Sequence, residues 1–210
     1  MLRSKENPGE YFYFDTHVHT RETSCCGKIN GSEVASAYKK AGYHGVVITD
    51  HYCRDYFRRF PRMGWKEKIE RFLSGYRAAK EEGARIGLMA LLGIELRFDE
   101  SDNDYLVYGI DEQFLKEYPE LYSLGLERFR RLVMRLETEG KGKVLIYQAH
   151  PFRLGLSPAD PLLLDGVEVF NGNPRQQSRN ELAYKYAKER GLKMISGSDF
   201  HRSGDLGRGG

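Results

Sequence analysis

A chain of 210 residues fits one globular domain, and its 40% apolar and 12% aromatic content excludes an intrinsically disordered protein. No run approaches the ~18 consecutive apolar residues of a membrane-spanning helix, and three cysteines are too few for a disulfide framework. The net charge of +3 is too small to indicate nucleic-acid binding by itself. The N-terminal segment MLRSKENPGEYF lacks the apolar core of a signal peptide, so we expect a cytoplasmic protein with reduced thiols.

Short apolar runs alternate along the chain with longer amphipathic stretches. Seven runs rich in β-branched or aromatic residues are expected to be strands: Tyr11–Asp15, Gly45–Thr49, Leu88–Leu96, Tyr105–Gly109, Val144–Ala149, Gly166–Phe170 and Lys193–Gly197. The helical stretches between most of them predict parallel strand pairing with right-handed crossovers. The Gly-rich segment 204–210 is expected to be a mobile tail of a single domain that spans residues 1–210.

Helical periodicity marks five segments between these strands. In the first, Val34, Tyr38 and Ala41 share one face, with Ser32 as the expected N-cap and Gly42 as the stop. The others are expected over residues 69–83, 126–140 and 178–190, with a shorter helix over 112–117.

Residues that bind metals gather at the carboxyl ends of the predicted strands. Five of the six histidines lie there, together with two acids: His17, His19, His51, His150, His201, Glu95 and Asp199. In a parallel barrel these ends converge on one face, whereas an open sheet would spread them along an edge. We therefore expect an α/β barrel with its site at the carboxyl ends of the strands. The sixth histidine, His44, lies at the opposite end and is interpreted as structural.

The pair His17 and His19 has the spacing of a metal ligand pair. Residues two apart on an extended segment project to the same side, and two imidazoles suit Zn, Mn or Fe. Glu95 and Asp199 supply anionic oxygens, and a carboxylate can bridge two ions about 3.5–4 Å apart. A single histidine at a strand end is more often structural, but the whole set predicts metal binding.

With these motifs in their order, the chain resembles the PHP (polymerase and histidinol phosphatase) family of metal-dependent phosphoesterases. The resemblance covers nearly the whole chain and rests on Asp15-x-His17-x-His19-Thr20, Thr49-Asp50-His51, Gly93-Ile94-Glu95, Ala149-His150-Pro151, Glu168-Val169-Phe170-Asn171 and Gly197-Ser198-Asp199-x-His201. It implies a distorted seven-stranded TIM-like (β/α) barrel that holds two or three divalent ions, which are Mn, Fe or Zn.

The resemblance also implies residue roles. His17, His19, Glu95 and Asp199 would bind the first ion, Glu95 would bridge to a second ion shared with His150, and His51 and His201 would bind a third. Asp15 and Asp50 would orient imidazoles through the far ring nitrogen, and Glu168 and Asn171 would also support the ligands.

Two positions depart from the common family pattern. Many members carry a further ligand of the third ion soon after the first motif. At that place this chain has three candidates, Glu22, Cys25 and Cys26, and Glu22 is preferred. Cysteines in such a position are more often small buried packing residues than ligands. Where many members have a histidine before the fourth strand, this chain has Asp104, or Asn103 beside it. Asp104 as a ligand would favour Mn or Fe over Zn at the second ion.

The site predicts hydrolysis of a phosphoester by a metal-activated hydroxide, with Glu95, Asp199 and His201 as catalytic candidates. Arg153, Arg175 and Arg97 are the candidates to bind the substrate phosphate, followed by Arg208. The segment 54–66 mixes basic and aromatic residues, a composition that could bind a nucleotide or the end of a single-stranded nucleic acid. The alternative interpretation is a partly buried junction between a loop and a helix, whose basic residues face the solvent.

Three functions stay open at this point. The favoured one is a phosphoesterase that acts on a small phosphorylated metabolite or a nucleotide. The second is a nuclease that trims oligonucleotides, and the third is a metal-stabilised binding module without catalysis. No membrane partner is expected, nucleic acid is not favoured, and the sequence does not define the oligomeric state.

Overall fold

The computed structural model describes residues 11–210, which form eight strands and seven α-helices. Most of the N-terminal segment MLRSKENPGEYF, on which the signal-peptide expectation rests, lies outside the described residues. The strands are β1 (Phe14–Val18), β2 (Gly45–Ile48), β3 (His51–Tyr52), β4 (Met89–Arg97), β5 (Asp104–Tyr108), β6 (Leu145–Gln148), β7 (Gly166–Asn171) and β8 (Lys193–Gly197). The helices are α1 (Gly31–Lys40), α2 (Arg54–Arg58), α3 (Trp65–Phe72), α4 (Ser74–Ile86), α5 (Glu112–Glu117), α6 (Leu126–Thr138) and α7 (Asn180–Arg190), with short 3-10 turns η1 (Leu121–Ser123), η2 (Pro161–Leu163) and η3 (Ser203–Asp205).

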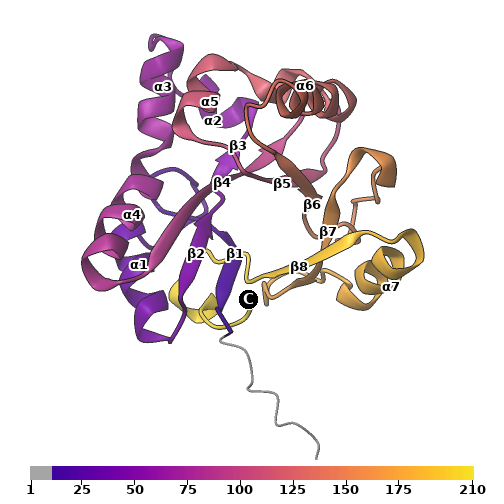
Figure 1. Cartoon of the computed structure of the whole chain (residues 1–210). Helices are drawn as coiled ribbons and strands as arrows, with labels where there is room; N and C mark the ends of the chain where they lie inside the picture. The colour runs from indigo at the N-terminus through magenta and orange to yellow at the C-terminus, as the bar shows by residue number, and fades with distance from the viewer. Residues whose placement is uncertain (1–10) are drawn as a thin grey trace, which may run out of the picture.

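The strands form one curved sheet in the order β1-β2-β4-β5-β6-β7-β8, with β3 paired beside the end of β4. A parallel bridge between Val18 and Phe200 brings the two edges of the sheet together, so that the strands encircle the centre of the molecule (Figure 1). The His19 amide donates to the Phe200 carbonyl at 3.0 Å, and the Phe200 amide donates to the His17 carbonyl at 3.1 Å. The α/β barrel predicted from the strand ends is therefore confirmed.

Strand β5 runs antiparallel to both neighbours, so the prediction of parallel pairing throughout is wrong for this strand. Residues 98–103 alone connect β4 to β5, and a parallel crossover needs about a dozen or more residues. The chain therefore turns back directly, and β5 begins at the end of the barrel where its neighbours finish. This reversal brings Asp104, the first residue of β5, to the face that carries the histidines.

The first strand lies further along the chain than predicted. It covers Phe14–Val18 instead of Tyr11–Asp15, and the three residues before it, Tyr11 to Tyr13, are exposed. His17 is thus a strand residue and His19 follows the strand directly, so the two side chains keep the same-side projection that their spacing predicts. His44 is exposed, and its Nδ1 accepts from the Tyr13 amide at 3.0 Å, which agrees with the structural interpretation.

Helix boundaries differ from the prediction where local hydrogen bonds decide them. Helix α1 begins after Asn30 and not after Ser32, because the Asn30 side chain accepts from the Glu33 amide at 2.9 Å. The single helix expected over residues 69–83 is two helices, α3 and α4, and α4 continues to the left-handed Gly87. Gly83 is an interior residue of α4, where a Cβ would lie 2.5 Å from the Leu88 carbonyl oxygen. Similarly, α7 begins at Asn180 and not at Ser178.

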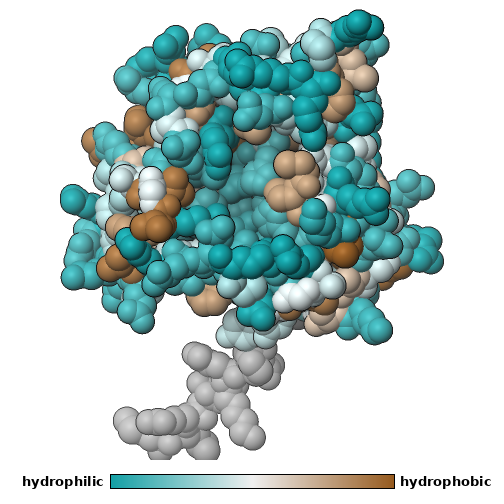
Figure 2. Space-filling model, turned by 180° about the vertical axis from the view of Figure 1, so that it is seen from behind, coloured by the Kyte–Doolittle hydropathy of each residue, from teal (hydrophilic) through white to brown (hydrophobic). Residues whose placement is uncertain are grey.

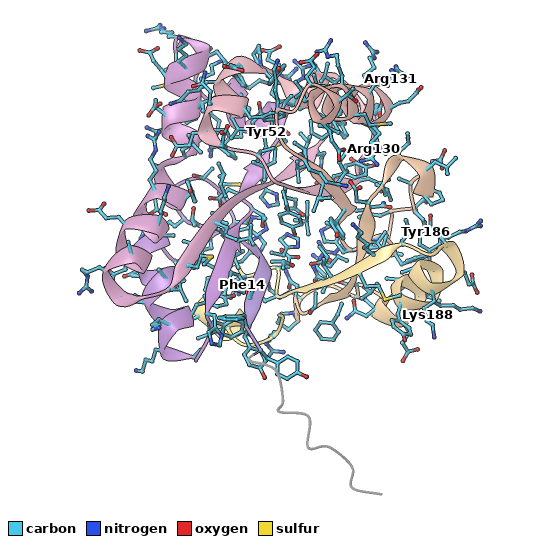
Figure 3. All side chains as sticks on the ribbon, viewed as in Figure 1. Phe14, Tyr52, Arg130, Arg131, Tyr186 and Lys188 are labelled. Carbon is cyan, nitrogen blue, oxygen red and sulfur yellow. The ribbon has the colours of Figure 1, made fainter. Side chains whose placement is uncertain are left out.

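The helices cover the outside of the barrel and bury its apolar core. Helices α1 and α4 lie side by side (Figure 1), and a Cβ on Gly31 would be 2.1 Å from the Gly75 carbonyl oxygen, so this contact needs glycine. On α6, Arg130 pairs with Asp165 at 2.8 Å, whereas Arg131 points away from the barrel (Figure 3). None of the helices within residues 11–210 has the length and apolarity needed to cross a membrane.

The C-terminal segment packs against the barrel and does not extend from it as a tail. Asp205 is buried and pairs with Arg175, and the Tyr43 hydroxyl donates to the Gly209 carbonyl at 2.5 Å. A Cβ on Gly209 would lie 2.1 Å from the Ser198 amide nitrogen, so the segment passes directly against the end of β8. The expectation of a mobile tail is corrected accordingly, because these contacts tie the segment to residues of the site.

Replacing Phe129 by alanine is expected to lower the free energy of unfolding by about 3–5 kcal/mol, as measured by urea denaturation. Phe129 is fully buried on α6 and packs against Phe98 with ring centroids 5.7 Å apart. The matched control is Phe170→Ala, since Phe170 is 46% exposed and the loss there should be within about 0.5 kcal/mol. Equal losses in the two variants would contradict the assignment of the core.

Candidate metal centre

His17 in β1 and His19 directly after it face two carboxylates, Glu95 from β4 and Asp199 from the segment after β8. His17 Nε2 lies 3.3 Å from Glu95 Oε1 and 3.7 Å from Asp199 Oδ1. His19 Nε2 lies 3.5 Å from Glu95 Oε2 and 3.4 Å from Asp199 Oδ1. All four side chains are buried. Four donors that bind one ion tetrahedrally at about 2.0–2.2 Å are about 3.3–3.6 Å apart, so this set has the spacing of a metal site.

Several of these atoms have no hydrogen-bond partner among the described residues. They are His17 Nε2, His19 Nε2 and Glu95 Oε2, all buried in the same place; His51 Nδ1 lies 2.6 Å from Glu95 Oε2 but outside hydrogen-bond geometry. An unpaired buried polar atom usually costs a few kcal/mol, so three together need a compensating group. A divalent ion satisfies all three at once, and the residues therefore fit the metal that the sequence predicts.

The far ring nitrogens of both histidines are held by oxygen atoms. His17 Nδ1 lies 2.9 Å from Glu168 Oε1, and His19 Nδ1 lies 3.2 Å from Ser24 Oγ. The Ser24 hydroxyl donates to Asp50 at 2.6 Å, so Asp50 acts on His19 through Ser24. Such partners fix the tautomer and direct the other nitrogen toward a metal. Ser24 was missed in the sequence because a serine between strand and helix carries no distinguishing signal.

Asp15 has a different role from the one that the resemblance implies. Its carboxylate accepts from the backbone amides of His17 and Ser198 at 3.1 and 3.0 Å and from the Tyr38 hydroxyl at 2.7 Å. It contacts no imidazole nitrogen among these hydrogen bonds, so its predicted role in orienting a ring is corrected. Instead, Asp15 joins β1 to the end of β8 and places the two ligand-bearing segments side by side.

A second group of donors adjoins the first and shares Glu95. His150 Nε2 lies 3.1 Å from Glu95 Oε1 and 4.0 Å from Asp104 Oδ2. The ligand atoms of Glu95, Asp104 and His150 all lie within 4.8 Å of one another. Glu95 is thus placed to bridge two ions. Asp104 is brought into this group by the reversed strand β5.

A third group lies at the outer edge of the cluster. The ligand atoms of His19, His51 and His201 lie within 4.8 Å of one another, and His51 Nδ1 lies 2.6 Å from Glu95 Oε2. Cys26 Sγ is 3.0 Å from His201 Nε2. Burial acts to raise the pKa of the Cys26 thiol, but hydrogen bonds with His201 and His51 lower it to about 6.

Glu22, which the sequence favours as an extra ligand of the third ion, does not lie in the cluster. Both of its carboxylate oxygens accept from the Gly31 amide, at 3.0 and 3.1 Å, at the start of α1. An acid at a helix N-terminus satisfies a free amide and is stabilised by the helix dipole, which explains this placement. Cys25 is exposed, whereas Cys26 points into the cluster.

The charges around the two central carboxylates keep both ionised. Burial acts to raise the pKa of Glu95, yet the His51 and His17 rings hold it well below its usual range. Burial also acts to raise the pKa of Asp199, but the charge of His17 and the contact with the His19 ring at 3.4 Å outweigh it and hold that pKa well below its usual range. Both groups therefore present anionic oxygens at neutral pH.

Two of the candidate ligands sit in strained backbone conformations. His150 has φ of 30° and Asp199 has φ of 52°, a region that residues other than glycine rarely adopt. Each residue lies two positions beyond the end of a barrel strand, His150 after β6 and Asp199 after β8. Asn171 and Asn173 donate to Asp199 Oδ2 at 3.4 and 3.2 Å and help to hold it. Strain of this kind gathers at functional sites, where the surroundings fix the geometry.

The three predicted phosphate-binding arginines each form an ion pair. Arg153 donates to Asp199 Oδ2 at 2.7 Å, and Arg97 pairs with Asp104 through contacts of 2.8 and 2.6 Å. Arg175 pairs with Asp205 at 2.5 and 2.8 Å. All three still line a pocket of about 220 Å³ that opens over His51, Glu95 and Asp199. The face seen in Figure 2 is hollowed at its centre, and the hollow is hydrophilic. Arg208 donates to the Gly204 carbonyl and lies outside this pocket.

The basic and aromatic segment 54–66 does not form a stacking surface for bases. Phe57 is buried in the core, and the Trp65 indole donates to the Leu115 carbonyl at 2.9 Å. Arg54 pairs with Asp99. The alternative interpretation, a buried junction with a solvated basic face, describes most of this segment. Tyr56 and Arg59 are the exceptions, because both line a second pocket of about 360 Å³ that also reaches His51 and Glu95.

Comparisons with known proteins agree with this site. The PHP domain family matches residues 15–207. A "Probable histidinol-phosphatase" of Deinococcus radiodurans is 27% identical, over 92% of this chain and 88% of that protein. The structure of PsfC from Pseudomonas syringae has a TM-score of 0.61 at 20% identity and covers 92% of this chain and 78% of that one. A Bacteroides vulgatus two-domain protein, named as containing a predicted PHP-like metal-dependent phosphoesterase, has a TM-score of 0.61 at 15% identity, over 91% of this chain and 52% of that one.

The barrel and its buried histidine–carboxylate cluster define a metal-dependent hydrolase of phosphoesters. The chain belongs to the PHP domain family, whose match runs from Asp15 at the first ligand motif to beyond His201 at the last.

Glu168→Gln is expected to weaken metal binding by about 10–100-fold, because it removes the anionic partner of His17 Nδ1. Glu168→Ala should weaken it further, since the contacts to the His150 amide and to Asn171 are lost as well. Competition with a fluorescent zinc chelator measures both affinities. Unchanged affinity in the alanine variant would contradict the assigned role.

Proposed function

We propose that this protein hydrolyses phosphomonoesters of a small metabolite or nucleotide with two or three divalent ions, of Mn, Fe or Zn, bound in its cluster. His17, His19, Glu95 and Asp199 would hold the first ion, Glu95, Asp104 and His150 the second, and His51 and His201 a third. The observation that carries the proposal is the set of 3.3–3.7 Å separations between two imidazole nitrogens and two carboxylates, with unpartnered atoms at its centre. When bound, such ions neutralise phosphoryl oxygens and activate water for attack.

The chain's own residues contribute orientation and charge. Glu168 and Ser24 keep the Nε2 atoms of His17 and His19 directed into the cluster, and Arg153 adds a positive group beside Asp199. An arginine fork suits a phosphoryl group at that position. His201 lines the same pocket as Arg153, where it would help to hold the third ion.

The pocket of about 360 Å³ beside Glu95 is the place we propose for the organic part of the substrate. Ligand pockets of about 300–1,000 Å³ accommodate small molecules, so this volume supports a metabolite or single nucleotide over an oligonucleotide. The buried Tyr56 hydroxyl has no hydrogen-bond partner among the described residues. The Arg59 guanidinium lies 4.6 Å over the Tyr56 ring and is absent from the ion pairs of the described residues.

The first test is hydrolysis of p-nitrophenyl phosphate by Mn-loaded protein, followed by a substrate panel. Because one relative is named "Probable histidinol-phosphatase", histidinol phosphate is the first natural substrate to assay. Nucleoside monophosphates and a 5′-phosphorylated oligonucleotide complete the panel. We expect turnover of a monoester that stops on exhaustive chelation and returns with the metal. Activity that survives chelation would overturn the proposal, and a strict preference for the oligonucleotide would replace it with a nuclease.

Arg59→Ala is expected to raise KM for the preferred natural substrate by about tenfold with little change in kcat. A charged hydrogen bond contributes about 1.5–3 kcal/mol, and ~1.4 kcal/mol is a factor of ten. The matched control is Arg58→Ala, since Arg58 is 69% exposed and does not line the pocket. Steady-state kinetics of both variants check the assignment, and an equal KM in both would remove Arg59 from the substrate pocket.

A further inference from the structure

The loop between β1 and α1 holds Cys26 at the outer edge of the metal cluster. The Ser24 amide donates to the Thr20 carbonyl at 3.0 Å, and the Gly27 amide donates to the Ser24 carbonyl at 2.9 Å. Directly after this turn, the Lys28 amide donates to the His201 carbonyl at 2.8 Å. Backbone hydrogen bonds therefore fix the chain on both sides of Cys26. One of them, from Lys28, goes to His201, the residue whose ring Cys26 contacts.

The His201 ring presents an electron pair toward the sulfur. His201 Nδ1 lies 2.8 Å from the carbonyl oxygen of Asp199, which can only accept a hydrogen bond, so this nitrogen carries the proton. In the neutral ring, Nε2 is then unprotonated and faces Cys26 Sγ at 3.0 Å. This is the tautomer that a metal-binding histidine needs.

Other donors converge on the same place. His51 lines the same pocket as Cys26 and His201, and its ring centroid lies 5.9 Å from that of His201. The ligand atoms of His19, His51 and His201 lie within 4.8 Å of one another, and His19 Nε2 is buried without a partner. The carboxylate that could compete for this position, Glu22, is bound to the Gly31 amide.

From this arrangement we infer that Cys26 binds the outermost ion of the cluster as a thiolate, together with His51 and His201. The inference rests on the proposed function and gives the cluster two chemically different ends. A thiolate with two imidazoles selects Zn or another borderline ion over Mn, whereas Glu95, Asp104 and His150 offer mainly oxygen. The protein would therefore take unlike metals at its outer and bridging sites.

Titration of the metal-depleted protein with Co²⁺ tests the inference by absorption spectroscopy. A thiolate ligand gives an intense near-ultraviolet charge-transfer band, whereas imidazole and carboxylate ligands give only weak visible bands. We expect the band in the wild type, its complete loss in Cys26→Ser and its retention in Cys25→Ser. We also expect Cys26→Ser to bind the outermost zinc equivalent at least about tenfold more weakly, since loss of even an outer partner costs about 10–100-fold.

Alkylation of the wild-type chain gives a second readout that needs no variant. Zinc should slow the reaction of iodoacetamide with Cys26 and leave that of the exposed Cys25 unchanged, as peptide mass spectrometry would show. Visible cobalt bands and hydrolysis without a charge-transfer band would overturn the thiolate ligand and leave the proposed function intact. Failure to bind any cobalt would overturn both.

Discussion

Glu95→Gln is expected to abolish hydrolysis, with kcat/KM for a phosphomonoester falling by at least about 1,000-fold. Glu95 contacts four imidazoles, those of His17, His19, His51 and His150, at 3.3, 3.5, 2.6 and 3.1 Å. An amide keeps its shape but not its charge, so the two ions that we propose to share this residue would lose their common anionic ligand. Several kcal/mol of charge stabilisation depends on those ions, and ~1.4 kcal/mol is tenfold in rate.

The measurement pairs kinetics with metal analysis by inductively coupled plasma mass spectrometry. Metal content should fall together with activity, while circular dichroism shows a folded chain. Glu181→Gln is the matched control, because Glu181 is exposed in the first turn of α7 and should change neither quantity. A glutamine variant that keeps its metal and its activity would remove Glu95 from the centre of the site.

Much of this centre could be predicted because its residues follow strand ends in the sequence. The same-side projection of His17 and His19 follows from the two-residue period of a strand, and it survives a shift of three residues in the strand boundary. The direction of β5 was predicted wrongly because the apolar pattern of a buried strand is the same in both directions. Only the short connection over 98–103 distinguishes the two, and it decides that Asp104 joins the site.

The partners of polar side chains were harder to predict than their positions. Glu22 and Asp15 are acids close to the ligand motif, yet one binds the start of α1 and the other binds two backbone amides and Tyr38. An acid in a loop finds the nearest free amide or hydroxyl, and which one is nearest depends on packing between distant segments. The ion pair of Arg175 has the same origin, because its partner Asp205 lies 30 residues further along the chain, whereas Arg97 and Asp104 face each other on the adjacent strands β4 and β5.

Removal of the metal is expected to lower the melting temperature by about 8–16 °C. An ion present at about 1,000 times its dissociation constant stabilises the folded state by about 4.1 kcal/mol. For a chain of about 150–250 residues, each kcal/mol shifts the melting temperature by about 2–4 °C. The structural reason is the buried set of unpartnered atoms on His17, His19 and Glu95, which a bound ion satisfies.

Differential scanning calorimetry with and without a chelator measures this shift, and the Glu95→Gln variant serves as its control. That variant is expected to bind metal poorly, so chelation should change its melting temperature by much less than that of the wild type. An equal shift in both proteins would mean that the chelator acts elsewhere. A large shift confined to the wild type, without hydrolysis of any phosphoester, would favour the metal-stabilised binding module over the enzyme, because the cluster would then contribute to folding and not to chemistry.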